Sequence, residues 1–446
     1  MNYRKKLNKL IPGGSHTYSR GFDQFPSNAP QILTHGKGPY VWDNKKIKYL
    51  DYGMGLRSVT VGYANKTINK EVIKNLNKGN NLTLPSILEI KAAEELVSLI
   101  GSAEMVKFAK NGSNVTTAAV KIARAYTGKQ VILIPKEHPF FSFDDWFIGK
   151  TQMNKGVPEE YKIHTDFFNF NDPVSLEMLF EKHKNNVAAV MLEPSTTITP
   201  CFNSCSSQIE CRKCNNNAKN FLKKVENICK INKAIFILDE MITGFRWDLR
   251  GAQNYFGVVP DISTFGKGMA NGFSIAALVG KKKILDVGSI NKPNMERTFL
   301  LSSTHGAEMT GLAAFLAVVK FYKDHDVCDY LWDYGKKLKQ NFNELIHINR
   351  LEDNFKIVGE DILFNFNTLI DNKYSYELRT LFLQELLKNN ILMPWISPSY
   401  SHKKKELKET CKAINSALKI CKIALKSNLR KYLKGNIIKP VFRKYN

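Results

Sequence analysis

The sequence contains no long apolar run and carries no export signal. No stretch approaches the ~20 apolar residues that a membrane-spanning helix requires, so we expect no transmembrane segment. The basic start Met1–Lys6 is not followed by the apolar segment of a signal peptide. Without an export signal, the eight cysteines predict reduced thiols rather than disulfides, and a cytoplasmic protein.

Acidic residues are scarce, with 41 Asp and Glu against 65 Lys and Arg and a net charge of +24. Such a charge can indicate a nucleic acid or an anionic surface as partner. The lysines are spread along the chain, which favours a generally basic surface and no nucleic-acid partner. At the end of the chain, however, no acidic residue follows Glu409, and Lys419–Asn446 contains nine Lys and Arg. Residues 416–446 are predicted to be a basic tail, either solvated or touching an anionic surface, and we favour the solvated end.

A short apolar run, Ala234–Leu238, is followed by Asp239 and is typical of a buried strand. Ligands of open α/β sheets bind beyond the carboxyl ends of the strands, which is where Asp239 stands. Lys267 follows 28 residues later between two glycines, Gly266 and Gly268. The pair could be a simple buried ion pair. Pyridoxal phosphate enzymes, however, require a lysine that forms a Schiff base and an acid that keeps the pyridine nitrogen protonated.

A second motif, Asn111-Gly112-Ser113-Asn114, opens a stretch of small residues with helical character. A Gly-Ser turn at a helix start suits a phosphate group, because the free N–H groups and the positive end of the helix dipole face it. Taken alone, the turn is more typical of an ordinary helix cap than of a phosphate site. The aromatic segment Pro139–Trp146 is either a core cluster or a stacking platform for a ring.

These motifs, with Leu238–Arg246 and Pro260–Lys282, resemble the class III aminotransferases, and most closely the glutamate-1-semialdehyde aminomutase branch. The resemblance covers about residues 10–415. It implies the α/β fold of type I pyridoxal phosphate transferases, with a mostly parallel seven-stranded sheet in a large domain and a smaller α+β domain. It also implies a homodimer with shared active sites. The predicted divisions are an N-terminal arm and hairpin at 1–55, the large domain at 56–320, the small domain at 321–415 and the tail at 416–446.

The resemblance also implies roles for individual residues. Lys267 carries the cofactor as a Schiff base and moves the proton, Asp239 binds the pyridine nitrogen, and Phe140 stacks on the ring in place of the family's tyrosine. The phosphate ligands are Gly112, Ser113 and Asn114, with Asn114 replacing the usual glutamate, and Thr304 from across the dimer interface. Arg20 is either a clamp for the substrate carboxylate or a surface arginine.

An insertion at 201–219 leaves the family pattern. It holds four of the eight cysteines within 14 residues: Cys201, Cys205, Cys211 and Cys214. Four thiolates could bind a structural zinc ion or an iron–sulfur cluster, or they could remain unliganded in a surface loop. Structural zinc is the option that we carry forward as a prediction.

Three functions compete. The first is an aminotransferase that moves an amino group from a donor to a small aldehyde or keto compound, for example a sugar or surface-glycan precursor. The second is a glutamate-1-semialdehyde 2,1-aminomutase, against which the altered 140–145 segment and the cysteine insertion argue. The third is a non-catalytic, metal-stabilised binding protein on a transaminase fold. The presence of both Lys267 and Asp239 argues against the third.

Overall fold

The computed structural model describes residues 2–201 and 220–445 of the 446. The chain divides into two compact units, which are described separately. The larger is Lys66–Cys328, and the smaller combines Met1–Asn65 with Asp329–Asn446. The domain boundaries suggested by the sequence stay predictions.

The larger unit is built on a seven-stranded sheet, in which every neighbouring pair from β9 to β6 is parallel. Only β10 runs antiparallel, to both β4 and β9. The predicted seven-stranded, mostly parallel sheet is thus confirmed. In spatial order the strands are β4 (Met105–Ala109), β10 (Ala276–Gly280), β9 (Ile262–Phe265), β8 (Ile235–Asp239), β7 (Val187–Leu192), β5 (Val131–Pro135) and β6 (Thr165–Phe168).

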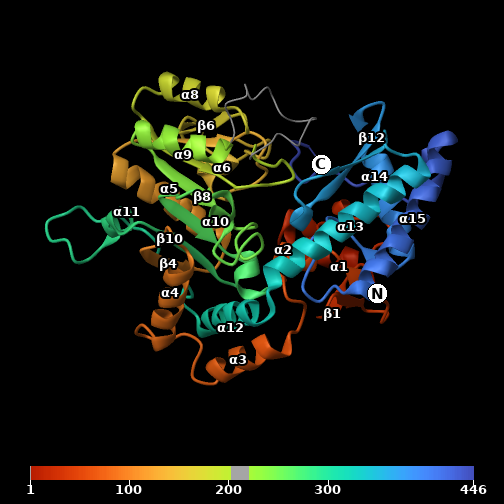
Figure 1. Cartoon of the computed structure of the whole chain (residues 1–446), viewed down its shortest axis with the longest axis horizontal. Coiled ribbons are helices and arrows are strands. Elements are labelled where there is room, and N and C mark those ends of the chain that lie inside the picture. Colours follow the sequence, from red (N-terminus) through yellow and green to blue (C-terminus); the bar gives the residue numbers. More distant parts are fainter. Residues whose placement is uncertain (1, 202–219, 446) are drawn as a thin grey trace. The chain divides into compact units, whose positions relative to one another are not determined.

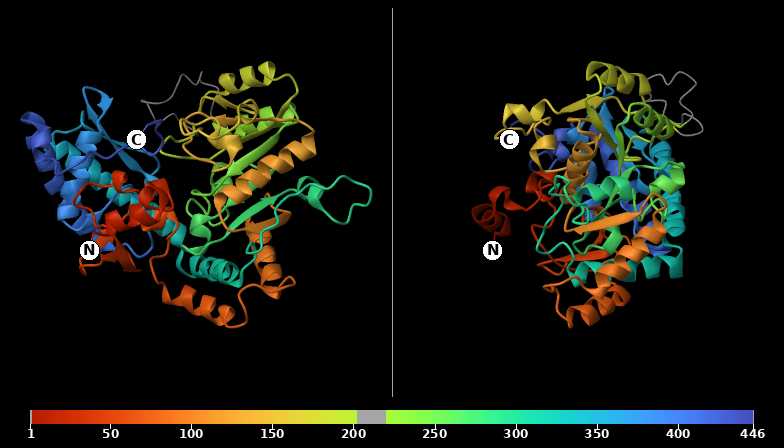
Figure 2. Two further views of the ribbon diagram at one scale, coloured as in Figure 1. Left: turned by 180° about the vertical axis from the view of Figure 1, so that it is seen from behind. Right: turned by 90° about the vertical axis from the view of Figure 1, so that its left-hand side faces the viewer.

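Helices cover both faces of this sheet, and five of its strands are buried at every residue. Figure 1 shows α9 in front of the sheet, and the reverse view in Figure 2 shows α5 in front. Coverage on both sides explains why these strands are continuous apolar runs without alternation. The helices of this unit are α3 (Lys66–Leu76), α4 (Ile87–Leu99), α5 (Gly112–Thr127), α6 (Asp145–Ile148), α7 (Glu159–Lys162), α8 (Pro173–Lys182), α9 (Phe221–Ile231), α10 (Ala252–Phe256), α11 (Lys282–Leu285) and α12 (Met309–His325).

The smaller unit joins the two ends of the chain in one sheet, because β3 pairs in parallel with β14. A core of apolar side chains, among them Phe342, Phe366 and Phe382, lies beneath its helices. Its strands are β1 (Leu33–Lys37), β2 (Tyr40–Asp43), β3 (Lys48–Asp51), β11 (Phe355–Val358), β12 (Asn365–Ile370), β13 (Lys373–Tyr374) and β14 (Ile391–Leu392). Its helices are α1 (Tyr3–Leu10), α2 (Met54–Arg57), α13 (Val327–Asn349), α14 (Tyr376–Lys388) and α15 (Lys404–Lys426).

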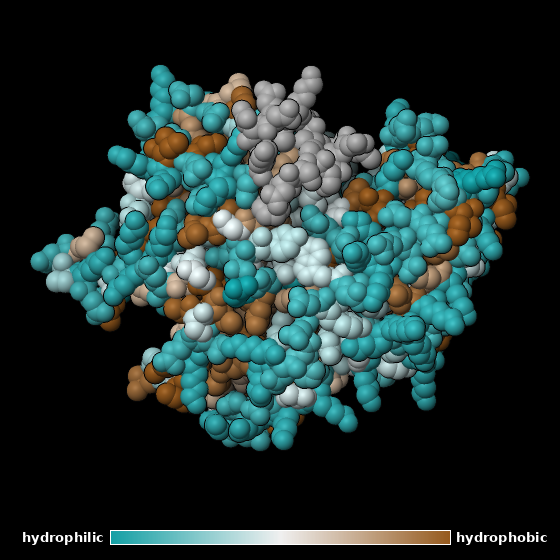
Figure 3. All heavy atoms as spheres, viewed as in Figure 1, coloured by the Kyte–Doolittle hydropathy of each residue, from teal (hydrophilic) through white to brown (hydrophobic). Residues whose placement is uncertain are grey.

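The end of the chain differs from the solvated tail that its charge suggested. Residues 416–426 are the last turns of α15, and the segment after them packs against the smaller unit. The reason lies in the apolar residues between the lysines: Leu429, Tyr432 and Leu433 lie against the core, and Ile438 is part of it. Figure 3 shows hydrophilic side chains over most of the visible face. No helix within 2–201 or 220–445 has the length and apolar character to span a membrane.

Candidate active site

Asp239 ends β8 and is 3% exposed. Its Oδ1 atom accepts two hydrogen bonds, from the Thr264 hydroxyl at 2.8 Å and from the Met241 N–H at 3.0 Å. Thr264 lies directly opposite Asp239 on the neighbouring strand β9. The Oδ2 atom has no hydrogen-bond partner among the described residues, so this buried carboxylate keeps one acceptor open.

Lys267 follows β9 and begins a short 3-10 turn, Lys267–Ala270. Its φ of 43° lies in the left-handed region, which is uncommon for a residue with a side chain and is found preferentially at functional sites. The structure brings Lys267 near Asp239: burial raises the pKa of the Asp239 carboxyl, and the positive charge of Lys267 and the bond from Thr264 oppose this rise. The two residues on which the prediction depends therefore act on each other electrostatically.

Met241 fills the space between the start of α5 and the residue before Lys267. It is 8% exposed. A Cβ atom added to Gly266 would lie 2.4 Å from the Met241 sulfur, and one added to Gly112 would lie 3.2 Å from its side chain. A side chain at position 266 would therefore have to displace the Met241 side chain. Sequence reasoning did not single out Met241, although its place directly after Asp239-Glu240 was an available signal.

The start of α5 offers donors to an anion. The Asn111 side chain caps the helix by accepting from the Asn114 N–H at 3.1 Å, so this N–H is already used. The N–H groups of Gly112 and Ser113 have no partner in the described part of the chain, as expected for the first positions of a helix. The Ser113 hydroxyl oxygen accepts from the Phe143 N–H at 3.1 Å, which leaves its own proton to donate.

Two adjacent aromatic residues after β5, Phe140 and Phe141, differ in their exposure to solvent. Phe141 is 2% exposed and belongs to the core, and its carbonyl accepts from the Thr116 hydroxyl at 2.8 Å. Phe140 is 43% exposed and meets Phe147 edge to face, with ring centroids 5.8 Å apart. The structure therefore leaves Phe140, and not Phe141, accessible for stacking.

Thr304 lies in the loop before α12, where it is exposed and forms no hydrogen bond with any described residue. The loop around it is anchored through Glu308. This residue pairs with Lys110 at 2.6 Å and with the His305 ring at 3.1 Å. The loop thus holds Thr304 outward rather than against its own unit.

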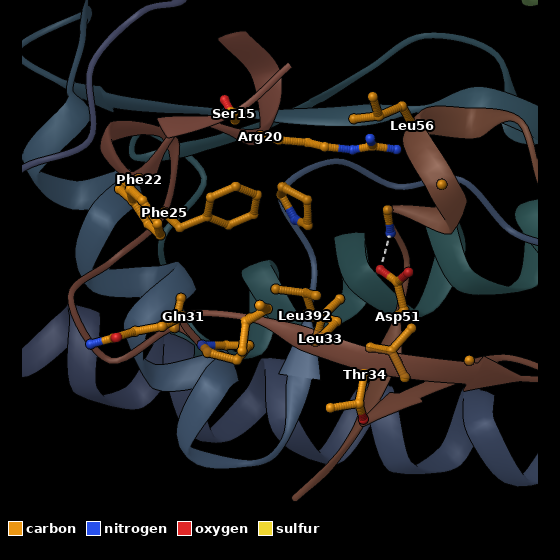
Figure 4. A pocket seen from close by; sticks show the side chains of 18 of the residues that line it. Ser15, Arg20, Phe22, Phe25, Gln31, Leu33, Thr34, Asp51, Leu56 and Leu392 are labelled. Carbon is orange, nitrogen blue, oxygen red and sulfur yellow. Dashed lines mark hydrogen bonds between the residues drawn. The ribbon is translucent and has the colours of Figure 1, made fainter. Parts of the chain in front are cut away.

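Arg20 belongs to the smaller unit, at the edge of a cavity of about 600 Å³. Figure 4 shows its side chain extending along this cavity toward Leu56. The guanidinium forms no hydrogen bond or ion pair among residues 2–201 and 220–445. Asp51 also lines this cavity, and its carboxylate accepts a hydrogen bond from the Tyr63 hydroxyl at 2.7 Å. Burial raises the pKa of Asp51 to about 6. Apolar residues complete the lining: Phe22, Phe25, Leu33, Leu392 and Trp395.

The predicted metal ligands cannot be placed together. Cys205, Cys211 and Cys214 lie outside the described residues. Cys201 is buried, and its N–H donates to the Asn171 side chain at 2.9 Å. Within the described ranges, no group of three or more His, Cys, Asp or Glu side chains could hold a metal ion.

The family model described as aminotransferase class-III matches residues 23–418. The chain belongs to the class III aminotransferase family. The family recognised from the motifs is therefore confirmed, and with it the class of enzyme: a pyridoxal phosphate-dependent aminotransferase or aminomutase.

Two curated relatives align with nearly the whole class III chain. The 3-aminobutyryl-CoA aminotransferase of Cloacimonas acidaminovorans is 29% identical over 94% of this chain and 96% of its own. The glutamate-1-semialdehyde 2,1-aminomutase of Wigglesworthia glossinidia brevipalpis is also 29% identical, over 93% of this chain and 96% of its own.

Solved structures show the same fold. An ω-transaminase from Sphaerobacter thermophilus superposes with a TM-score of 0.81 at 21% identity, over 94% of this chain and 97% of its own. A glutamate-1-semialdehyde aminomutase from Pseudomonas aeruginosa gives a TM-score of 0.78 at 16% identity, over 93% of each chain. At these identities the likeness shows the fold type I architecture.

Pyridoxal phosphate is the cofactor typical of this family, and the residues present fit it. The buried Asp239 carboxylate keeps an open oxygen that can accept the pyridine N–H. Gly112 and Ser113 offer unpaired main-chain donors at a helix start, where a phosphate binds well. Lys267 supplies the amine within the electrostatic reach of Asp239.

Proposed function

We propose that this class III enzyme is an aminotransferase that moves an amino group from an amino donor to a small aldehyde or keto compound, for example a sugar or surface-glycan precursor. The observation that carries the proposal is the buried Asp239 carboxylate, which Thr264 orients and which lies within the influence of Lys267. This is the pair that amino-group transfer with pyridoxal phosphate needs.

When bound, the cofactor supplies the electron sink that stabilises negative charge at the carbon next to the transferred nitrogen. Lys267 would hold the cofactor through its amine, and the same amine could move the proton at the carbon next to the transferred nitrogen as general base and acid. Through Oδ2, Asp239 would accept a hydrogen bond from the protonated pyridine nitrogen, while Thr264 and Met241 hold its Oδ1 atom. Because Asp239 is buried, water does not compete for this contact.

The phosphate and the ring engage residues of two further segments. Gly112 and Ser113 provide main-chain N–H groups and the Ser113 hydroxyl donates in addition. The Asn114 N–H is occupied by the helix cap, so only its side chain remains for the phosphate. Phe140 stacks on one side of the ring without the hydroxyl of the family's tyrosine. Arg20 binds a substrate carboxylate, for which a guanidinium has the fitting geometry.

A homodimer would complete the site with Thr304 from the second subunit. Apolar side chains exposed around α3 and α4 support this proposal, because contiguous exposed apolar residues mark interaction surfaces. Six large apolar residues between positions 73 and 90 are at least 44% exposed: Ile73, Leu76, Leu82, Leu84, Ile87 and Ile90. A structural zinc ion at the four cysteines stays a separate proposal.

The second candidate is the aminomutase reaction, favoured by the relatives that carry this name. Both reactions use Lys267 and Asp239. They differ in their demand for a donor, because only the aminotransferase consumes an external amino compound.

The test is the absorption spectrum of the purified protein with pyridoxal phosphate, before and after addition of L-glutamate, L-alanine, β-alanine and 4-aminobutyrate. An absorption band near ~400–430 nm that shifts to ~330 nm with one donor supports the aminotransferase. A band that none of these donors shifts favours the aminomutase. Lys267→Ala removes turnover and covalent attachment; retention of the cofactor–lysine band would show that another lysine holds the cofactor.

A further inference from the structure

The end of the chain, residues 428–444, is attached along α14 of the smaller unit; we call it the C-terminal strap. It lies beyond residue 418, where the family match ends. The buried Gln384 side chain of α14 forms hydrogen bonds with the strap main chain at two positions, Tyr432 and Lys434. Its Nε2 donates to the Tyr432 carbonyl at 2.9 Å, and its Oε1 accepts from the Lys434 N–H at 2.6 Å.

Two more contacts fasten the strap to α14. The Ile438 side chain is 6% exposed within the core, and its N–H donates to the Thr380 hydroxyl at 3.0 Å. Near its start, the Arg430 guanidinium donates twice to the Glu377 carboxylate, at 2.9 and 3.0 Å. The strap is therefore a fixed part of the smaller unit.

From α14 the strap reaches the N-terminal arm, which we define as residues 11–32. The Lys439 N–H donates to the Asp23 carbonyl at 2.9 Å, and the Arg443 guanidinium pairs with the Asp23 carboxylate at 2.5 Å. Gly435 passes close to the arm: its φ is 90°, and a Cβ atom there would lie 2.2 Å from the Ser27 hydroxyl oxygen. Only glycine satisfies both conditions.

The arm has few anchors besides the strap: Phe25 and Ala29 pack against a small apolar cluster, and the Asn28 side chain donates to the Gln384 carbonyl at 3.0 Å. Its only fully buried residues are Gly14, Gly21 and Pro26, none of which contributes a large side chain to a core. Asp23 follows Arg20 by three residues. The two belong to consecutive 3-10 turns, Tyr18–Arg20 and Phe22–Gln24, which meet at Gly21. A displacement of Asp23 would therefore move Arg20.

We propose that the C-terminal strap, through the Arg443–Asp23 ion pair, positions Arg20 to bind the carboxylate of the substrate. The inference rests on the proposed role of Arg20 as carboxylate clamp. Asp23 and Arg443 are positioning residues and do not touch substrate. Their loss should weaken substrate binding, because a charge-assisted hydrogen bond between a guanidinium and a carboxylate depends on its geometry.

The experiment compares Arg20→Ala, Asp23→Asn and Arg443→Gln with the wild-type holoenzyme. The probe is the donor from the panel above that changes the absorption spectrum most. We expect Arg20→Ala to raise the KM for this donor about 10-fold or more and Asp23→Asn about 5-fold, with kcat within about twofold, as loss of a charge-assisted contact predicts. The exchanged pair, D23R with R443D, should restore most of the KM.

The matched control is Asp333→Asn, which breaks the Lys337–Asp333 pair of 2.6 Å on the exposed face of α13. The same Asp→Asn change there removes an exposed ion pair in the same unit but away from the arm, so the KM should stay at the wild-type value. If Arg20→Ala raises the KM and Asp23→Asn does not, the positioning role is refuted while the clamp stands. If Arg20→Ala has no effect, the clamp and the positioning role both fail.

A second measurement does not depend on activity. Hydrogen–deuterium exchange of peptides covering residues 12–27 should rise at least about threefold in Asp23→Asn and Arg443→Gln relative to Asp333→Asn, because opening the contact exposes the arm's N–H groups. Unchanged exchange in these peptides would refute the proposal even if the KM rises.

Discussion

The Thr264 hydroxyl donates to the Asp239 carboxylate across neighbouring strands at 2.8 Å, with both residues buried. Their backbones are paired in register, so the sheet itself sets this contact. The second bond to the same oxygen comes from the Met241 main chain, so among the described residues Thr264 is the only side chain that hydrogen-bonds this carboxylate. We therefore expect Thr264 to contribute to cofactor binding through Asp239.

Thr264→Val keeps the shape of the side chain and removes the hydroxyl. We expect the affinity for pyridoxal phosphate to fall about 10-fold or more, since a hydrogen bond to a charged group contributes about 1.5–3 kcal/mol. Titration with pyridoxal phosphate, followed by absorbance, measures the change. Thr264→Ser retains the donor and should stay within about threefold of the wild type. Equal affinities for the valine variant and the wild type would contradict this role.

Ser113 offers a test of the phosphate site. Its oxygen accepts from the Phe143 N–H, so its proton is available to a ligand. We expect Ser113→Ala to weaken binding of pyridoxal phosphate about 10-fold, as the loss of one charge-assisted hydrogen bond implies.

The control for Ser113 is pyridoxal, which lacks the phosphate. Its affinity should be the same for Ser113→Ala and the wild type if the hydroxyl binds the phosphate. An equal loss with both ligands would mean that Ser113 acts only by holding the segment at Phe143.

The sequence predicted the sheet because its strands are short apolar runs closed by charge, as at Asp239. It also named Lys267, because the residues around it resemble the class III aminotransferases; the Asp239–Lys267 pair alone could have been a buried ion pair. Met241 was missed because an apolar residue at a cofactor site has the same chemistry as one in the core. Its place directly after Asp239-Glu240 was the available sequence signal, and its contacts with Gly112 and Gly266 in three dimensions distinguish the two.

The C-terminal strap was missed for a different reason. Nine cationic residues with no acidic residue after Glu409 are typical of a solvated end. The partners that fix it, Gln384 and Asp23, are 50 and 420 residues away from the strap residues that they bind. No local pattern encodes such contacts, so they could not be predicted from one sequence.

His138 is also fixed by a residue far away in the sequence, Glu193, and its burial leads to a prediction about pH. This side chain is 4% exposed after β5, and its Nδ1 atom accepts from the Glu193 N–H at 3.1 Å. Burial lowers the pKa of His138 to about 3, so the ring is neutral in the folded protein. In the unfolded chain it protonates near ~6.5.

Between these two pKa values the unfolded state therefore binds one more proton than the folded state, and stability falls as the pH is lowered through this window. For this single group the free energy of unfolding should drop by about 1 kcal/mol between pH 6 and pH 5. His138→Phe removes the titrating group and leaves the Glu193 N–H without this acceptor, a cost that does not depend on pH. Urea unfolding of both proteins at pH 7, 6 and 5 should give curves that converge as the pH falls, because only the wild type loses this contribution. Parallel curves would mean that His138 is protonated in the folded state or exposed to solvent.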